Sequence, residues 1–199
     1  AVKPQQLAEL AADLPSLANK LVISILAGTP IRRLEQLGSR RVVRAMPNLA
    51  ALVGESLTGW IGTSAISTED RLVVEATLSS IGMTIELNNE AKLDALTAVS
   101  GSGPGYVAWF AEQLAQAAIK LGFSASQADH IVRQTLVGTA KLFSSDRRSF
   151  GDIRAAVTSK GGTTEAALAV LADRKAEEAI VEAIRAAAAR AQSIAKDQA

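Results

Sequence analysis

Residues 157–168 read Val-Thr-Ser-Lys-Gly-Gly-Thr-Thr-Glu-Ala-Ala-Leu. One predicted helix ends where this stretch begins, Gly161 and Gly162 turn the chain, and the next helix starts at the two threonines. The first amides of a helix have no intrahelical partner and can bond an anion, and glycines let a ligand approach the backbone. Three hydroxyl groups, which both donate and accept hydrogen bonds, stand on Ser159, Thr163 and Thr164. The set suits a small molecule that carries a carboxylate and a ring nitrogen.

The same stretch is also compatible with an ordinary corner between two helices. In that interpretation a threonine caps the second helix, and Glu165 is favoured in its first turn by the helix dipole. The spacing alone favours that structural corner, and a second glycine-rich stretch, residues 100–106, argues against it.

Composition excludes several classes of protein. With 199 residues, of which 48% are hydrophobic, the chain can bury a core as one large domain or two small ones. The net charge of +1 gives no support for a nucleic-acid or anionic-membrane partner. Cysteine is absent and His130 is the only histidine, which argues against a metal site and against a Ser-His-Asp triad. No apolar run approaches the ~20 residues that span a bilayer. No signal peptide is visible, so a cytoplasmic location is expected.

The first half of the chain alternates predicted helices and strands. Helices are expected at 5–19, 31–38 and 68–82, and short apolar strands at 21–26, 41–45, 57–63 and 83–87. This alternation predicts a doubly wound α/β unit with buried parallel strands. Such nucleotide-binding units normally carry a Gly-x-Gly-x-x-Gly turn after their first strand. None follows a strand here, so the chain is expected to begin partway through such a domain.

The second half is predicted to be helical throughout. A helix at 90–99 leads into a loop at 100–105, with Pro104 placed to open the next helix. Further helices are expected at 106–121, 125–144, 150–157, 164–172 and 174–196. The segment 106–121 is apolar almost all round, which is typical of a buried helix. A bundle this short with so much apolar surface predicts a partner subunit. Trp60 and Trp109 are expected in the core or at an interface.

Five motifs occur in a fixed order along the chain and together resemble the pyrroline-5-carboxylate reductase family. They are Ala1-Val2-Lys3-Pro4-Gln5, Ser24-Ile25-Leu26-Ala27-Gly28, Arg44-Ala45-Met46-Pro47-Asn48, Ser100-Gly101-Ser102-Gly103-Pro104 and Val157-Thr158-Ser159-Lys160-Gly161-Gly162-Thr163-Thr164. The resemblance runs from end to end of the chain.

The resemblance implies an α/β plus all-α fold. Residues 1–89 would be the C-terminal part of an NAD(P)-binding Rossmann-like domain with a partial doubly wound sheet. Residues 90–199 would be a helical substrate-binding and dimerisation domain, similar to the C-terminal domain of 6-phosphogluconate dehydrogenase. The implied reaction is hydride transfer from NADPH, or NADH, to 1-pyrroline-5-carboxylate, giving L-proline as the last step of proline biosynthesis. Subunits intertwine as homodimers in this family, and many members form decamers. No metal, nucleic acid or membrane is implied.

The resemblance also assigns roles to individual residues. The cofactor would be lined by Ala1, Val2, Lys3, Pro4, Leu26, Ala27, Gly28, Met46, Pro47 and Asn48. The substrate would be held by Ser159, Gly161, Gly162, Thr163 and Thr164, with its carboxylate on the Ser159 hydroxyl and the Gly162 and Thr163 amides. Thr164 would be the catalytic residue, with its hydroxyl bonded to the ring nitrogen.

The chain departs from the family pattern at three points. The opening Rossmann segment with its glycine fingerprint is expected to precede Ala1, so this chain by itself should bind NADPH poorly. Lys160 stands where the family usually has proline, and Gly105 stands where it often has alanine.

Two other hypotheses remain open. One is a helical dimerisation or binding fragment that performs no chemistry. The other is a related dehydrogenase acting on another small acid, which would need a catalytic lysine on the long helix. The only lysine between residues 100 and 121 is Lys120, close to the end of that helix.

Overall fold

The computed structural model describes residues 6–197, and the chain divides into two compact units. The first unit comprises 1–104 and 183–199, and the second comprises 105–182. The predicted cofactor contacts Ala1, Val2, Lys3 and Pro4 lie outside the described residues.

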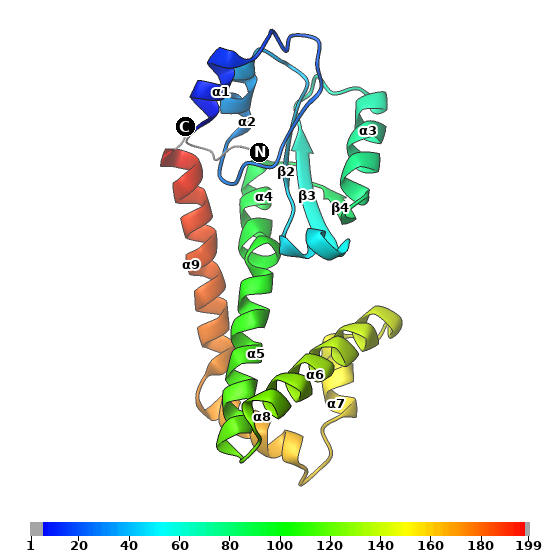
Figure 1. Ribbon diagram of the computed structural model, residues 1–199, viewed down its shortest axis with the longest axis vertical. Helices are drawn as coiled ribbons and strands as arrows, with labels where there is room; N and C mark the ends of the chain where they lie inside the picture. The colour runs from blue at the N-terminus through cyan, green and yellow to red at the C-terminus, as the bar shows by residue number, and fades with distance from the viewer. Residues whose placement is uncertain (1–5, 198–199) are drawn as a thin grey trace. The chain divides into compact units, whose positions relative to one another are not determined.

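The first unit contains one small mixed sheet (Figure 1). Its order is β1–β2–β3–β4, with β1 at Val22–Ser24, β2 at Val42–Met46, β3 at Ser56–Gly62 and β4 at Gly82–Glu86. β1 runs parallel to β2, and β3 runs parallel to β4, as predicted. β2 and β3 are antiparallel, so the expectation of parallel strands is wrong for this pair. Their connection, residues 47–55, is shorter than the dozen or more residues that a parallel crossover requires.

Helices cover both faces of this sheet, which confirms the doubly wound prediction. α3 (Thr68–Ser79) lies on one face, and α1 (Leu7–Asp13), α2 (Ile31–Leu34) and α4 (Glu90–Leu96) lie on the other (Figure 1). Side chains alternate between the faces along a strand. Accordingly, β2 sends Val43 and Ala45 into a core with Trp60 and the α3 residues Val74 and Leu78. Val42, also on β2, packs with Leu7 and Leu34 on the other face of the sheet.

Two of the predicted boundaries in this unit are wrong. The first helix was expected over residues 5–19, but α1 ends at Asp13 because Leu14 is extended (ψ 142°) before Pro15. The residue before a proline is driven out of the helical region by the proline ring. The region 100–105 was expected as a loop, but the chain stays helical there. α4 runs into a π-helical turn, η4 (Thr97–Gly101), and α5 (Gly103–Lys120) follows at once.

The second unit is entirely helical within its described residues. It contains most of α5, together with α6 (Ala125–Ser145), α7 (Phe150–Ala156), α8 (Thr163–Asp173) and the start of α9 (Ala176–Asp197). These bounds lie close to the predicted ones. The expectation that 106–121 is a buried helix is wrong for the single chain, because α5 contains no buried residue. Trp109 on α5 is 63% exposed, whereas Trp60 in the sheet is fully buried.

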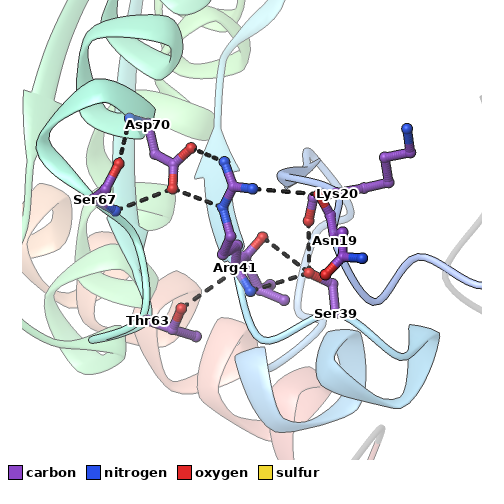
Figure 2. Close-up of polar contacts among 8 residues, drawn as sticks. Asn19, Lys20, Ser39, Arg41, Thr63, Ser67 and Asp70 are labelled. Atoms are coloured by element: carbon purple, nitrogen blue, oxygen red, sulfur yellow. Dashed lines mark hydrogen bonds and ion pairs between the residues drawn. The ribbon is translucent and has the colours of Figure 1, made fainter.

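A cluster of charged and polar residues lies at the amino ends of β1 and β2 (Figure 2). Arg41, just before β2, donates from Nε to the Asp70 carboxylate at 2.8 Å and forms an ion pair with it through Nη2. Asp70 also accepts from the Ser67 amide at 3.0 Å, which completes a capping box at the start of α3. Arg41 Nη1 reaches the Asn19 carbonyl at 3.3 Å, just before β1. The cluster therefore joins α3 to the segments that enter β1 and β2, at the end of these strands away from the predicted cofactor residues.

None of the helices that the structure describes is both long and apolar enough to cross a bilayer.

Candidate active site

The described cofactor residues gather at one edge of the sheet. In the parallel pair β1 and β2, Ser24 lies opposite Arg44, so the carboxyl ends of the two strands are adjacent. The residues that follow β1 are Leu26, Ala27 and Gly28, and those at the end of β2 are Met46, Pro47 and Asn48. Ligands of open α/β sheets bind outside the carboxyl ends of their strands. Ala27 is exposed and the other five residues are half-buried, so this edge can present a surface to a nicotinamide cofactor.

Gly28 is required by the local backbone and by its neighbour. Its φ is +66°, a conformation that residues with a side chain rarely adopt. A Cβ at this position would fall 2.3 Å from Ile194 Cγ2 on α9, within the same unit. The side of Gly28 on which a side chain would stand is therefore filled by α9, and its backbone is the part that a ligand could approach.

A buried ion cluster lies directly before the Met46–Asn48 segment. Arg44 on β2 is only 3% exposed. Its Nη1 contacts Glu90 Oε1 at 2.8 Å, and its Nη2 contacts Asp94 Oδ1 at 2.7 Å. Glu90 Oε1 also accepts from the Ile31 amide at 3.0 Å. This cluster fixes α4 and the start of α2 to β2, and so supports the edge that carries the predicted cofactor residues.

Asn48 joins the end of β2 to the π-helical turn. Its Oδ1 accepts from the Ala50 amide at 3.0 Å, and its Nδ2 donates to both the carbonyl oxygen and the Oγ of Ser100, each at 3.1 Å. Sequence reasoning singled out the Ser100 motif but gave Ser100 no role in the site. A serine among glycines at position 100 was a visible sign of a special role. Its partner could not be read from the sequence, because Asn48 lies 52 residues earlier in the chain.

The predicted substrate loop lies in the second unit and forms a tight turn. The Gly162 amide donates to the Ser159 carbonyl at 2.9 Å, and Gly161 has φ +72°. Lys160 does not have a positive φ. A hydrogen bond between the first and fourth residues, with a positive φ only at the third, is the pattern of a type II turn. Lys160 therefore occupies the second position of that turn.

The turn leads directly into α8. Its N-cap is Gly162 and makes no side-chain capping bond, so the threonine cap of the purely structural interpretation is wrong. Thr163 and Thr164 are the first two helical residues. The Glu165 carboxylate accepts from the Gly161 amide at 2.7 Å. This bond folds Glu165 back over the turn and satisfies the Gly161 amide, while the first amides of α8 keep no side-chain cap.

Ser159 packs closely against Gly162 inside the loop. A Cβ on Gly162 would fall 2.4 Å from Ser159 Oγ and 2.9 Å from the Ser159 carbonyl oxygen. The Ser159 hydroxyl thus lies against the backbone at the start of α8. In this state the Gly162 amide is engaged by Ser159, so of the two amides predicted for a substrate carboxylate, this one is already in use within the turn.

A separate apolar groove of about 610 Å³ lies between α7, α8 and the first turn of α9. Its lining includes Thr158, Leu168, Leu171 and Ile180 but none of the predicted substrate residues. Among residues 6–197 no group of three or more histidine or acidic side chains could hold a metal ion, and His130 is exposed on α6.

Residues 90–194 match the family described as "Pyrroline-5-carboxylate reductase dimerisation". The pyrroline-5-carboxylate reductase of Synechocystis sp. is 39% identical over 198 residues, which cover 98% of this chain and 74% of the relative. That of Haemophilus influenzae is 37% identical over 199 residues, covering 98% and 73%.

Solved structures agree with the sequence relatives. The pyrroline-5-carboxylate reductase from Coxiella burnetii superposes with a TM-score of 0.89 at 33% identity, covering 98% of this chain and 74% of that one. A Plasmodium falciparum pyrroline carboxylate reductase with NADP bound gives a TM-score of 0.88 at 29% identity, covering 98% and 79%. Since the family match covers more than half of the chain and the relatives cover nearly all of it, the chain belongs to the pyrroline-5-carboxylate reductase family of oxidoreductases.

Proposed function

We propose that the reaction of this protein is the reduction of 1-pyrroline-5-carboxylate to L-proline, with NADPH or NADH as the donor. The observation that carries the proposal is the substrate loop. A type II turn places the Ser159 hydroxyl against the first turn of α8, with the hydroxyls of Thr163 and Thr164 directly after it.

The loop supplies the two kinds of group that the substrate needs. The Thr163 amide at the start of α8 and the Ser159 hydroxyl suit its carboxylate. The Thr164 hydroxyl is half-buried and has no hydrogen-bond partner among the residues that the structure describes. It can therefore hold a proton beside the ring nitrogen, where a protonated imine accepts hydride far more readily than a neutral one. Fixing the ring at both its carboxylate and its nitrogen orients the carbon that is reduced.

The sheet edge suits the cofactor. When bound, the nicotinamide supplies the hydride. Leu26, Ala27 and Gly28, with Met46, Pro47 and Asn48, would line it, as would Ala1, Val2, Lys3 and Pro4. A relative from Plasmodium falciparum has been solved with NADP, which supports the choice of cofactor class.

We propose residues 1–89 as part of the cofactor domain and 90–199 as the substrate and dimerisation domain. The family match begins at Glu90, which supports this division. We also propose that the chain forms a homodimer and that dimers assemble further, as in decamers. The support is the matched dimerisation family and the exposed apolar side chains of α5, among them Trp109 at 63% and Val107 at 54%.

The reaction is tested with the complete gene product by following loss of NADPH absorbance with 1-pyrroline-5-carboxylate. Thr164→Ala should lower kcat by roughly 10²-fold, the lower range for a lost proton-transfer group, and Thr164→Ser should retain most activity. Thr135→Ala is the matched control, because Thr135 is a threonine of α6 whose hydroxyl bonds only the Ile131 carbonyl.

Calorimetric titration with L-proline separates binding from chemistry. Proline binding that disappears in Thr164→Ala supports an intact substrate pocket. Proline binding with no turnover by the complete gene product would instead identify a binding or dimerisation protein that performs no chemistry. Equal kcat in Thr164→Ala and in the wild type would contradict the proposed role of Thr164.

A further inference from the structure

The Ser100–Pro104 motif has no role in the proposed reaction, yet it adopts an unusual backbone. Its first residues belong to the π-helical turn η4, in which the Ser102 amide donates to the Thr97 carbonyl, five residues earlier, at 2.9 Å. Single π-helical turns are rare and occur frequently at functional sites. In a regular α-helix the Ser100 carbonyl would accept from the amide of residue 104, which is proline and has no N–H, so this oxygen lacks its usual helical donor.

Asn48 provides that partner and uses its whole side chain to do so. Both hydrogens of a carboxamide nitrogen can be donated, and here Nδ2 reaches the Ser100 carbonyl oxygen and Ser100 Oγ, each at 3.1 Å. Oδ1 accepts from the Ala50 amide at 3.0 Å, which fixes which end of the amide is oxygen. Ser100 Oγ then donates to the Leu57 carbonyl at 3.3 Å. No N–H of Asn48 is left for a ligand.

The backbone of the same segment is held as firmly as its side chain. The Asn48 amide donates to Ser56 Oγ at 3.0 Å, at the start of β3. Met46 approaches the turn so closely that a Cβ on Gly101 would lie 3.2 Å from Met46 Cε. Glycine at 101 therefore lets Met46 pack directly on the π-helical turn. All these residues belong to the first compact unit.

We infer that Asn48 and Ser100 form a positioning pair: their hydrogen bonds hold the Met46–Asn48 segment in its place at the cofactor edge, and Asn48 acts on the cofactor through that segment rather than through its own carboxamide. The inference rests on the proposed function, because it assigns this edge to the nicotinamide cofactor. Ser100, which the reaction itself does not require, becomes a determinant of cofactor affinity.

The first test measures NADPH binding to the complete gene product by calorimetry, which requires no turnover. Asn48→Ser keeps a side-chain oxygen that can cap the Ala50 amide but is too short to reach Ser100. We expect it to weaken NADPH binding about 10-fold, and Ser100→Ala about 3-fold, because Asn48→Ser removes both bonds between the two residues and Ser100→Ala removes one of them. Ser100→Ala also removes the bond from Ser100 Oγ to the Leu57 carbonyl. Because the two residues act together, the double variant should bind no more weakly than Asn48→Ser alone. Ser102→Ala, in the same motif, is the matched control.

Kinetics distinguish positioning from general destabilisation. The KM for NADPH should rise in both variants, while the KM for 1-pyrroline-5-carboxylate should stay within about 2-fold of wild type, because the substrate loop lies in the other compact unit. The inference would be overturned if Asn48→Ser weakened NADPH binding and Ser100→Ala did not, because Asn48 would then contact the cofactor directly. Additive losses of NADPH affinity in the double variant would overturn it as well. Unchanged NADPH affinity in both variants would also overturn it, because the Asn48–Ser100 hydrogen bonds would then have no effect on the cofactor.

Amide hydrogen exchange without cofactor tests whether the Asn48–Ser100 hydrogen bonds stabilise the π-helical turn. Asn48→Ser should accelerate exchange at the Ser102 amide by about 10-fold, because the π-helical turn loses its external bonds. Unchanged protection at Ser102 would sink the inference whatever the enzyme does. A complete gene product that binds NADPH as predicted but reduces no 1-pyrroline-5-carboxylate would instead reject the proposed function and leave the positioning pair intact.

Discussion

Replacing Lys160 by proline should tighten the substrate loop. Lys160 occupies the second position of the type II turn 159–162, where a φ near −65° is required and proline is favoured. The side chain is exposed, and no hydrogen bond to the Lys160 amide is seen in the part of the chain that the structure describes. The substitution is therefore compatible with the turn as it stands.

Two effects of comparable size oppose each other in this variant. Proline at a compatible position reduces the freedom of the unfolded or open loop, which contributes ~0.4–1 kcal/mol, or a factor of ~2–5 in an equilibrium constant. Losing an exposed positive charge near an anionic substrate weakens binding by at most ~1 kcal/mol in a well-solvated site. The net change in the KM for 1-pyrroline-5-carboxylate should therefore stay within ~3-fold, and the melting temperature should rise.

The variant Lys160→Gln separates the two effects, because it removes the charge without fixing φ. We expect Lys160→Gln to raise the KM and Lys160→Pro to show a lower KM than Lys160→Gln. The difference in KM between Lys160→Gln and wild type should decrease at high salt, since exposed charges are screened. A KM for Lys160→Pro that shifts by 10-fold or more, or a lower melting temperature than that of Lys160→Gln, would show that the turn is not of type II.

Three further predictions concern the framework of both units. Arg44→Met should destabilise the first unit by roughly 3 kcal/mol, because it leaves the carboxylates of Glu90 and Asp94 without their buried partner; urea unfolding followed by Trp60 fluorescence in a Trp109→Phe background measures this, and a loss below ~1 kcal/mol would contradict it. The bonds from Arg41 and the Ser67 amide lower the pKa of Asp70 to about 2, so its stabilisation is complete above about pH 4, the unfolded value, and is lost as pH falls towards 2; the acid branch of the stability curve should be flatter in Asp70→Asn, and parallel curves would refute the assignment. Gly162→Ala and Gly161→Ala should each raise the KM for substrate, the first because its Cβ would lie 2.9 Å from the Ser159 carbonyl oxygen and the second because Gly161 has φ +72°; an unchanged KM in either variant would argue against the observed turn.

The order of helices and strands could be predicted because it depends on local patterns. Apolar runs, capping residues and the helix termination at Gly38 all act within a few positions, and Gly38 has a positive φ in the structure. The antiparallel pairing of β2 and β3 could not be derived from the strand patterns. It depends on the length of the connection between them, which the alternation of helix and strand conceals.

The π-helical turn was missed for a different reason. Its glycines and serines are typical of a loop, and the Asn48 side chain that bonds Ser100 in this turn comes from 52 residues earlier in the chain. The Glu165 bond to Gly161 was also missed, since a carboxylate in a first turn is normally attributed to the helix dipole. In both cases local sequence identified the segment but not the bond that sets its conformation.

The same limit explains the two tryptophans. Both were expected in a core or at an interface, and local sequence does not say which surface buries an apolar residue. Trp60 is covered by its own chain, whereas Trp109 and its neighbours Phe110 and Val107 are at least half exposed on α5. Burying large side chains stabilises by ~1.5–3 kcal/mol each, so a helix of this composition is unstable in water unless another surface covers it. We therefore expect Trp109→Glu to shift the oligomer towards monomer in sedimentation at low concentration, while Trp60 stays buried. A variant with unchanged mass would show that α5 does not form the subunit interface.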